Sequence, residues 1–438
     1  MEIDKTTIDD LSIFNSEEEF SVFSKINQCV TIRGKDQLRR SLSKPLESAD
    51  DIREVQRVLK FIIREKAHWP SLISNGTVMV VERFFESNIS AIPSTPSKIS
   101  AMSYKIINGH DYSLVRYSVN HYFDLVKGMQ QMVDHFTQSD TPELLKIILQ
   151  AAQKIIGSER LAIIGKYRKA SEMPPQEMLY LGHFFRYHYK NNMISLLSIF
   201  AQLDAWYGMA MAVVKYELIF PEIADSHQPV IDAKGLYHIL LREPVPYDVA
   251  LDKETNFLFL TGANMAGKST FIKAVGSAVF LAHMGMGVPA ASMRLSVFDG
   301  MLSNINVIDN IMKGESYFFN EVQRIKATVS KISDGRKWLI LIDELFKGTN
   351  VQDAMKCSLA VIEGLLKIKN SLFILSTHLY EIGDDLKGHP NITFNYFETS
   401  VLNDQLNFNY QLKSGISNDR LGYLILKKEG VVKMLEDL

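Results

Sequence analysis

The pattern of apolar positions changes character about halfway along the chain. Up to about residue 220, apolar side chains recur at helical spacing. The clearest segment places six apolar residues on one helical face: Ile52, Val55, Val58, Leu59, Ile62 and Ile63. After residue 222, short apolar runs alternate with helical stretches, which is typical of an α/β domain with a parallel sheet. The sequence therefore predicts a multidomain chain with an all-α helical domain over 1–222 and an α/β domain over 223–438.

Start and stop signals subdivide the helical part. Residues 1–92 are expected to be helical, with one helix over 31–42 and the next capped by Ser48 with Asp51 as its partner acid. A loop is expected over 86–98, where prolines and serines gather. Prolines 221, 229, 244 and 246 predict a linker over 222–250.

One stretch is long and apolar enough to cross a membrane. Met193–Val214 is almost continuously apolar, but Gln202 and Asp204 lie in its middle and no second such segment follows. A polar pair at that depth is costly in lipid. We therefore expect a buried helix of a soluble domain and no membrane partner.

Composition narrows the class of protein. Apolar residues make up 46% and charged residues 22%, which is ordinary for a globular chain. The net charge of −2 differs from the strongly positive charge that is typical of nucleic-acid-binding proteins. Any contact with nucleic acid must therefore come from a local basic patch. Cys29 and Cys357 show no zinc spacing, and the polar N-terminus shows no signal peptide. These features favour a cytoplasmic protein without structural metal.

Two local patches could contact nucleic acid. In His183–Lys190, basic and aromatic residues alternate, which suits phosphates and bases. On a helix, Phe184 and Tyr187 would more simply form part of a core stripe, and we favour that interpretation. The second patch is a basic cluster of similar ambiguity, which consists of Lys154, Arg160, Lys166, Arg168 and Lys169.

The strongest chemical signal is a glycine-bracketed loop between a buried strand and a helix. The strand is expected at Phe257–Thr261 and the helix begins after the loop. The loop and first turn have the P-loop spacing and consist of Gly262, Ala263, Asn264, Met265, Ala266, Gly267, Lys268, Ser269 and Thr270. Gly262 allows a sharp turn and Gly267 a close approach of backbone to phosphate. Lys268 can reach the β- and γ-phosphates of ATP, and Ser269 can hold Mg²⁺.

Two later strands end in residues that complete such a site. Trp338–Glu344 is an apolar run that ends in two acids. Asp343 is expected to assist Mg²⁺, and Glu344 to orient or polarise the attacking water. The apolar run Leu372–His378 ends in a histidine, and His378 beside the P-loop strand could sense the γ-phosphate. Ser316 precedes a predicted helix and could offer a further anion contact.

These motifs resemble those of the MutS family of DNA mismatch-repair ATPases, within the ATP-binding-cassette branch of P-loop ATPases. TGANMAGKST resembles the family's TGPNMGGKST, with Ala263 in place of proline. LILIDELFKGT resembles LVLMDEIGRGT, and LSTHLYEI resembles FATHYFEL. GESYFFNEV resembles GRSTFMVEM, with Glu315 and Tyr317 as departures. More loosely, residues 3–11 and 38–46 resemble parts of the family's helical core, or lever, domain.

The resemblance implies a Mg²⁺-dependent ATPase that works as a homodimer, with Ser316 of one chain completing the other chain's site as a catalytic group beside Lys268, Glu344 and His378. It also implies binding of double-stranded DNA and a role in mismatch repair or DNA-damage sensing, with a repair protein as a further partner. The family's mismatch-reading and connector domains are expected to be absent, and the clamp is expected to be reduced or missing. The alternative is an ATP-driven scaffold that binds a protein. Val245 and Tyr247 both remain candidates for stacking on adenine.

Overall fold

The computed structural model describes residues 1–306, 317–402, 405–417 and 431–436. As expected, a helical part is followed by an α/β part. Contacts divide the chain into two compact units, which do not follow a single boundary in sequence. Unit 1 combines Met1–Lys25, Lys44–Arg53 and Lys215–Leu438, whereas unit 2 combines Ile26–Ser43 and Glu54–Val214.

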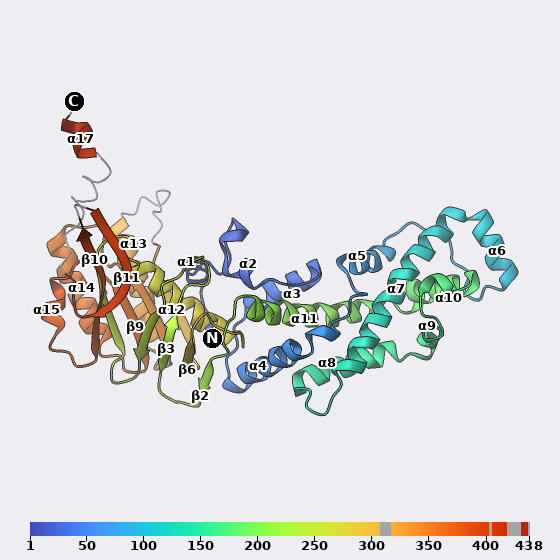
Figure 1. Cartoon of the computed structure of the whole chain (residues 1–438), viewed down its shortest axis with the longest axis horizontal. Coiled ribbons are helices and arrows are strands. Elements are labelled where there is room, and N and C mark those ends of the chain that lie inside the picture. Colours follow the sequence, from blue (N-terminus) through green and yellow to red (C-terminus); the bar gives the residue numbers. More distant parts are fainter. Residues whose placement is uncertain (307–316, 403–404, 418–430, 437–438) are drawn as a thin grey trace. The chain divides into compact units, whose positions relative to one another are not determined.

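Unit 2 is built from helices (Figure 1). Those of this part of the chain are α3 (Ile32–Leu42), α4 (Ala49–Arg64, which begins in unit 1), α5 (Asn75–Phe84), α6 (Lys98–Ile107), α7 (Gly109–Phe136), α8 (Glu143–Ile156), α9 (Ala162–Gly165), α10 (Pro175–His183) and α11 (Lys190–Lys215, whose last residue belongs to unit 1). The predicted helix over 31–42 is confirmed, with Thr31 as its cap. Ser48 and Asp51 bond to each other at the start of α4, also as predicted.

Asp204 is an acidic residue in the middle of the long apolar helix α11, and its hydrogen bonds account for its burial. Its carboxylate is fully buried and accepts hydrogen bonds from the N–H of Val30 at 2.8 Å and from the N–H and hydroxyl of Thr31 at 2.8 and 2.6 Å. The carboxylate therefore satisfies backbone donors at the start of α3. Among the described helices, α11 alone is long and apolar enough to cross a membrane, but 67% of its most apolar window is buried inside the structure.

Unit 1 is organised around a sheet of order β1-β7-β8-β9-β5-β10-β11, in which every neighbouring pair is parallel except β10 and β11. The strands are β1 (Glu2–Ile3), β5 (Phe257–Thr261), β7 (Gly300–Asn304), β8 (Trp338–Asp343), β9 (Ser371–Ser376), β10 (Ile392–Leu402) and β11 (Gln405–Ser414). The central strands are buried on both faces, as their continuous apolar sequences predict.

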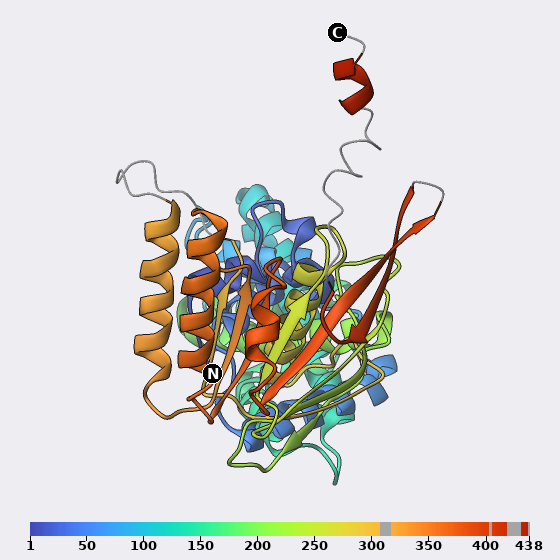
Figure 2. The same ribbon diagram turned by 90° about the vertical axis from the view of Figure 1, so that its left-hand side faces the viewer.

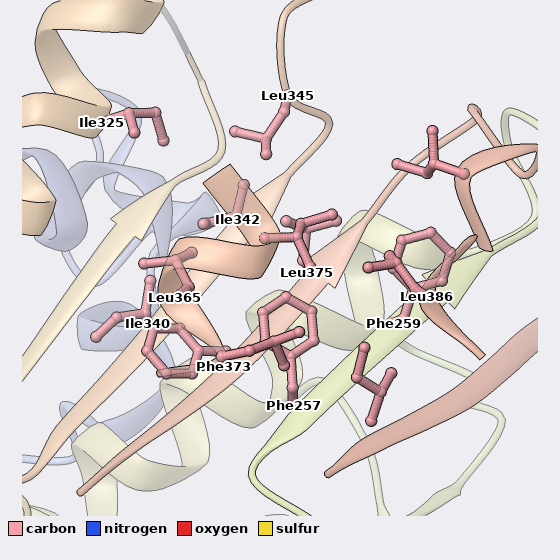
Figure 3. Close-up of a cluster of buried hydrophobic side chains, with 14 of the residues drawn as sticks. Phe257, Phe259, Ile325, Ile340, Ile342, Leu345, Leu365, Phe373, Leu375 and Leu386 are labelled. Carbon is pink, nitrogen blue, oxygen red and sulfur yellow. The ribbon is translucent and has the colours of Figure 1, made fainter. Parts of the chain in front are cut away.

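Helices pack on both faces of this sheet. On one face lie α13 (Tyr317–Ile332), α14 (Val351–Leu365) and α15 (Ile382–Leu386), whose apolar side chains join Phe257, Ile340 and Phe373 in a common core (Figures 2 and 3). On the other face lie α1 (Lys5–Asp10) and α12 (Lys268–His283). A Cβ on Gly276 of α12 would come within 2.6 Å of side chains of Leu11 and Leu341, so α12 packs closely on this face.

The predicted linker over 222–250 is wrong, because this segment contributes to a second sheet. That sheet has the order β2-β6-β3-β4. Its strands are β2 (Glu222–Ala224), β3 (Ile231–Leu236), β4 (Tyr247–Leu251) and β6 (Ser292–Ser296). The prolines lie beside these strands rather than in them, and β3 and β4 alternate buried and exposed residues as a half-buried antiparallel pair does.

The helical expectation for the first residues is also wrong. Glu2 and Ile3 form β1, which pairs with Gly300 and Met301 of β7. The helix α1 then brings the buried Asp10 to the end of β7, where its carboxylate accepts hydrogen bonds from Ser303 Oγ at 2.6 Å and from the N–H groups that follow the strand. Two further short helices of unit 1 are α2 (Val22–Ile26), which ends at the unit boundary, and α17 (Val431–Glu436).

Candidate functional site

The candidate site lies at the carboxyl edge of three adjacent strands. β9 lies between β8 and β5 in the sheet, and all three run parallel. The segments that follow these strands carry Lys268, at the start of α12, Glu344 and His378. In open α/β sheets, ligands bind outside the carboxyl ends of the strands. Residues far apart in sequence are therefore brought to one edge, as the sequence pattern predicts.

The loop from β5 to α12 has the backbone that its glycines permit. Gly262 and Gly267 have φ angles of 137° and 111°, in the left-handed region that favours glycine. Met265 also has a positive φ of 69° and its side chain is exposed. Gly267 is the N-cap of α12, so the loop leads directly into a helix N-terminus whose N–H groups favour an anion.

Lys268 is held inside the loop that precedes it. Its Nζ donates to the carbonyl oxygens of Gly262 at 2.8 Å and Ala263 at 3.0 Å. The side chain is only 5% exposed, and burial lowers the pKa of its ammonium although Glu344 and Asp343 act in the opposite direction. A phosphate at the start of α12 would offer this ammonium stronger, charged acceptors.

Ser269 and Asp343 face each other at the site. Ser269 Oγ donates to one carboxylate oxygen of Asp343, and Ser376 Oγ of β9 donates to the other. A hydroxyl and a carboxylate are oxygen ligands of the kind that Mg²⁺ prefers, and Mg²⁺ is usually held by one or two carboxylates together with substrate phosphates. This donor set fits Mg²⁺. Among the described residues, no three or more His, Cys, Asp or Glu side chains come together in a group that could hold a metal ion. A metal ion at Ser269 and Asp343 would therefore need phosphate oxygens as further ligands.

Glu344 is surrounded by basic side chains. Lys347 Nζ lies 3.1 Å from its Oε2, Lys268 Nζ 3.8 Å from its Oε1, and His378 Nδ1 3.9 Å from its Oε2. Burial opposes ionisation of this carboxyl, but Lys347, Lys268 and His378 together hold its pKa below the ordinary value. Glu344 is therefore a carboxylate at neutral pH, which suits a group that polarises or accepts a proton from water.

A pocket of about 600 Å³ opens over this edge of the sheet. Its lining includes the polar or charged residues Lys268, Ser269 and Glu344, and also Val245 and Tyr410. This volume lies within the range usual for ligand sites. The lining thus combines polar and charged side chains at the start of α12 with apolar and aromatic ones, and the ring of Tyr410 lies beside Gly267.

Val245 and Tyr247, the two candidates for stacking on adenine, differ in how far they are buried. Both residues line the pocket, but Val245 is half-buried, whereas Tyr247 is only 4% exposed and its ring packs edge-on against Phe271 and Phe397. Sequence reasoning missed Tyr410, whose ring is 41% exposed and lies beside Gly267. Its backbone has a positive φ of 54°, but nothing in the local sequence of β11 indicates this.

Ser316 lies outside the described residues. The structure does describe α13, which follows it in sequence, and the buried carboxylate of Glu321 on that helix. Sequence reasoning assigned Glu321 no role, although it lies in the quoted segment GESYFFNEV.

The aromatic and basic segment of unit 2 is mainly structural. Phe184 and Phe185 are buried in a π-helical turn at Phe184–His188, which supports the core interpretation for Phe184. The guanidinium of Arg186 donates to the carbonyl oxygens of Phe84 and Ser87 at 2.5 and 2.6 Å. Tyr187 is 49% exposed, so its assignment to the core is wrong.

The second basic cluster is open to solvent. All five of its side chains are exposed: Lys154, Arg160, Lys166, Arg168 and Lys169. Arg160 lies over the ring of Phe184, and none of the five forms an ion pair within the part of the chain that the structure describes. This cluster is thus the better candidate of the two for contact with phosphates.

Part of the chain is similar to known proteins. Residues 258–435 match the family model of MutS domain V. The chain is 25% identical over 308 residues to the DNA mismatch repair protein MutS of Lactococcus lactis subsp. cremoris, covering 69% of this chain and 34% of that protein. It is 29% identical over 253 residues to the DNA mismatch repair protein MSH3 of Candida glabrata, covering 56% of this chain and 24% of that protein. The matched region therefore spans about a third or less of these relatives. The chain thus contains a segment similar to MutS domain V and is distantly similar to these two mismatch repair proteins.

Proposed function

We propose that the chain is a MutS-like ATPase that binds ATP with Mg²⁺ at the carboxyl edge of β5, β8 and β9. The observation that carries this proposal is the meeting of Lys268, Ser269, Asp343 and Glu344 in one pocket region, although they come from two distant segments. Ser269 lies at the start of α12 and Asp343 at the end of β8, yet their side chains are hydrogen-bonded. Such an arrangement has the parts that phosphoryl transfer to water requires.

Each residue has a defined task in this proposal. Lys268 exchanges its bonds to the loop carbonyls for the β- and γ-phosphates, and Ser269 and Asp343 hold Mg²⁺. The metal ion, when bound, neutralises charge on the phosphates. Glu344 orients the attacking water and takes up its proton, and His378 contacts the γ-phosphate. The exposed ring of Tyr410 and the side chain of Val245 offer surfaces for the adenine base.

We further propose that two chains form the working unit and that Ser316 of each completes the site of the other. ATP binding and hydrolysis then drive movement of the helical unit. Because the helical unit carries the exposed basic cluster of Lys154–Lys169, we propose that this surface contacts the phosphates of double-stranded DNA, in a role related to mismatch repair. The repair names of the relatives support this role.

The test is a hydrolysis assay with purified chain, ATP and Mg²⁺, in the presence and absence of duplex, branched and mismatched DNA. Hydrolysis that depends on Mg²⁺ and changes with DNA supports both halves of the proposal. Unchanged hydrolysis with every DNA, together with no gel shift at low salt, contradicts the DNA half only. A matched variant replaces Lys166, Arg168 and Lys169 by glutamine, and should weaken DNA binding while leaving basal hydrolysis intact.

A specific observation favours an alternative function, in which ATP drives a scaffold that binds a protein. The outward face of α6 carries Ile99, Met102, Ile106 and Ile107, which are 53–81% exposed. Lys98 and Lys105 lie along one flank, and α6 contains no acid. An apolar protein segment with acidic side chains along one edge would fit this stripe. Affinity capture of one identified partner that is lost on Ile106→Glu, without DNA binding, would favour this alternative.

A further inference from the structure

Glu321 of α13 is a buried carboxylate that none of the proposed steps uses. It is 2% exposed. Its Oε1 accepts a hydrogen bond from the N–H of Lys347 at 3.2 Å, and its Oε2 accepts one from the N–H of Gly348 at 3.4 Å. Burial raises the pKa of this carboxyl, while the loop N–H groups act against that rise. One side chain of α13 thus satisfies two successive backbone donors of the loop that follows β8.

That loop has a backbone that needs support. Glu344 and Phe346 have positive φ angles of 60° and 58°, a backbone conformation that is strained for residues other than glycine. Such conformations persist only where the surrounding structure holds them. Phe346 is 4% exposed, and its ring lies 5.6 Å from that of Phe318 on α13. The same helix therefore holds the loop twice, through a ring contact and through the carboxylate of Glu321.

The bonded part of the loop leads directly to the proposed water-activating group. Lys347, whose N–H is held by Glu321, places its Nζ 3.1 Å from Oε2 of Glu344. This ammonium is among the charges that keep Glu344 ionised. A shift of the Lys347 backbone would move the ammonium away from that carboxylate, so the hydrogen bond to Glu321 helps to hold this positive charge beside Glu344.

We propose that Glu321 is a positioning residue for ATP hydrolysis: by holding the backbone of Lys347 and Gly348, it aligns Glu344 without contacting nucleotide. This role rests on the proposed ATPase function. Glu321 does not line the pocket, whereas Lys268 and Ser269 do. Its loss should therefore lower kcat and leave nucleotide affinity unchanged, which distinguishes positioning from a general structural role.

The first test compares Glu321→Gln with Glu363→Gln in the full chain. Gln keeps the shape of the side chain but turns an NH₂ group toward one of the two loop donors. We expect kcat to fall about tenfold in Glu321→Gln, as for loss of one hydrogen bond to a charged group, with KM and the Kd for a fluorescent ATP analogue within about twofold. Glu363 is exposed on α14, so its variant should match the wild type in every measurement.

The second test is a double-mutant cycle between Glu321→Gln and Lys347→Met. If Glu321 acts through Lys347, the double variant should lose no more activity than the more damaged single variant. Additive losses would overturn this route. Unchanged kcat in Glu321→Gln, or equal losses of affinity, kcat and thermal stability, would overturn the positioning role. A wild-type chain that does not hydrolyse ATP contradicts the proposed function itself, and this role with it.

Discussion

The Nζ atom of Lys268 lies 3.8 Å from Oε1 of Glu344. Lys268 begins α12 and Glu344 follows β8, and the two side chains are only 5% and 16% exposed. Each charge therefore influences the other: the ammonium of Lys268 helps to keep Glu344 ionised, and Glu344 opposes the loss of the lysine proton. Substitution of either residue changes the charge environment of the other. Nucleotide affinity and the rate of hydrolysis should therefore be measured separately for each variant of this pair.

Replacing Lys268 by alanine should abolish detectable nucleotide binding. The ammonium is the one group of the loop that can follow the β- and γ-phosphates, and loss of such charged hydrogen bonds costs about 3 kcal/mol, or a factor of about 100 in Kd. Equilibrium titration with a fluorescent ATP analogue measures this. Lys253→Ala, at an exposed turn outside the pocket, serves as control. Affinity within about tenfold of the wild type in Lys268→Ala would contradict the assignment.

Replacing Glu344 by glutamine should leave binding intact and stop hydrolysis. Gln preserves the size of the side chain, but it cannot accept a proton from water, and loss of a general base costs about 10²–10⁴ in rate. Single-turnover hydrolysis and the Kd of the ATP analogue are measured on the same preparation. Turnover that survives while binding is normal would refute the role of Glu344.

Replacing Gly34 by alanine should destabilise unit 2. A Cβ at this position would lie 2.1 Å from Oδ2 of Asp204, the carboxylate that bonds to the start of α3. Relief of this overlap would displace a buried, hydrogen-bonded carboxylate, which we expect to cost about 2–3 kcal/mol of unfolding free energy. Urea unfolding followed by circular dichroism measures it.

Gly76→Ala is the matched control for this substitution. Gly76 lies exposed near the start of α5, and the nearest atom that its Cβ would meet is 3.6 Å away. Alanine should raise stability there by about 0.5 kcal/mol, because it restricts the unfolded chain without strain. Equal effects of the two substitutions would show that the carboxylate of Asp204 can move freely.

His283 should make unit 1 sensitive to mild acid. Its Nδ1 lies 3.0 Å from the carbonyl oxygen of Leu46, and its Nε2 accepts a hydrogen bond from the N–H of Phe298 at 3.2 Å. Burial lowers the pKa of this imidazole to about 4. The unfolded chain binds a proton near pH 6.5 and the folded chain does not, so stability is complete above that pH and falls between about 6.5 and 4.

The expected loss from His283 between pH 7.5 and pH 5 is about 2 kcal/mol. His283→Gln should be less stable at pH 7.5 but should lose less on acidification. Replacing Trp69 and Trp206 of unit 2 by phenylalanine leaves Trp338 to report on unit 1 in urea titrations. The same pH dependence in both proteins would assign the effect to other groups, such as His238, whose pKa burial also lowers to about 4.

The sequence predicted the parts of this fold that carry a local signal. The apolar runs before Gly262 and Glu344 are central strands, and the spacing of apolar residues in α4 gave its buried face. Because parallel strands bring their carboxyl ends to one edge, the motif order was enough to expect Lys268, Glu344 and His378 together. Their catalytic roles remain predictions.

The parts that the sequence did not predict depend on contacts between distant residues. β1 is only two residues long, which is too short to show the alternation of apolar and polar residues that indicates a strand. Its partner strand β7 lies almost 300 residues later in the chain. The strands of the second sheet are short, and prolines beside them suggested a linker. Tyr410 and Glu321 have other aromatic or charged residues near them in the sequence. Only the folded structure shows that Tyr410 lines the pocket and that Glu321 is bonded to the loop after β8.

The pairing of β1 with β7 has a consequence for synthesis of the chain. Glu2 leaves the ribosome almost 300 residues before Gly300, its partner in the sheet. At usual elongation rates of 5–20 residues per second, that interval is about 15–60 s. During this time the helical unit can fold, because its last segment ends at Val214. Glu2 and Ile3 have no partner strand until β7 has been synthesised. A fragment that starts after the helical unit would expose the edge of β7, and unpaired edges of this kind invite aggregation.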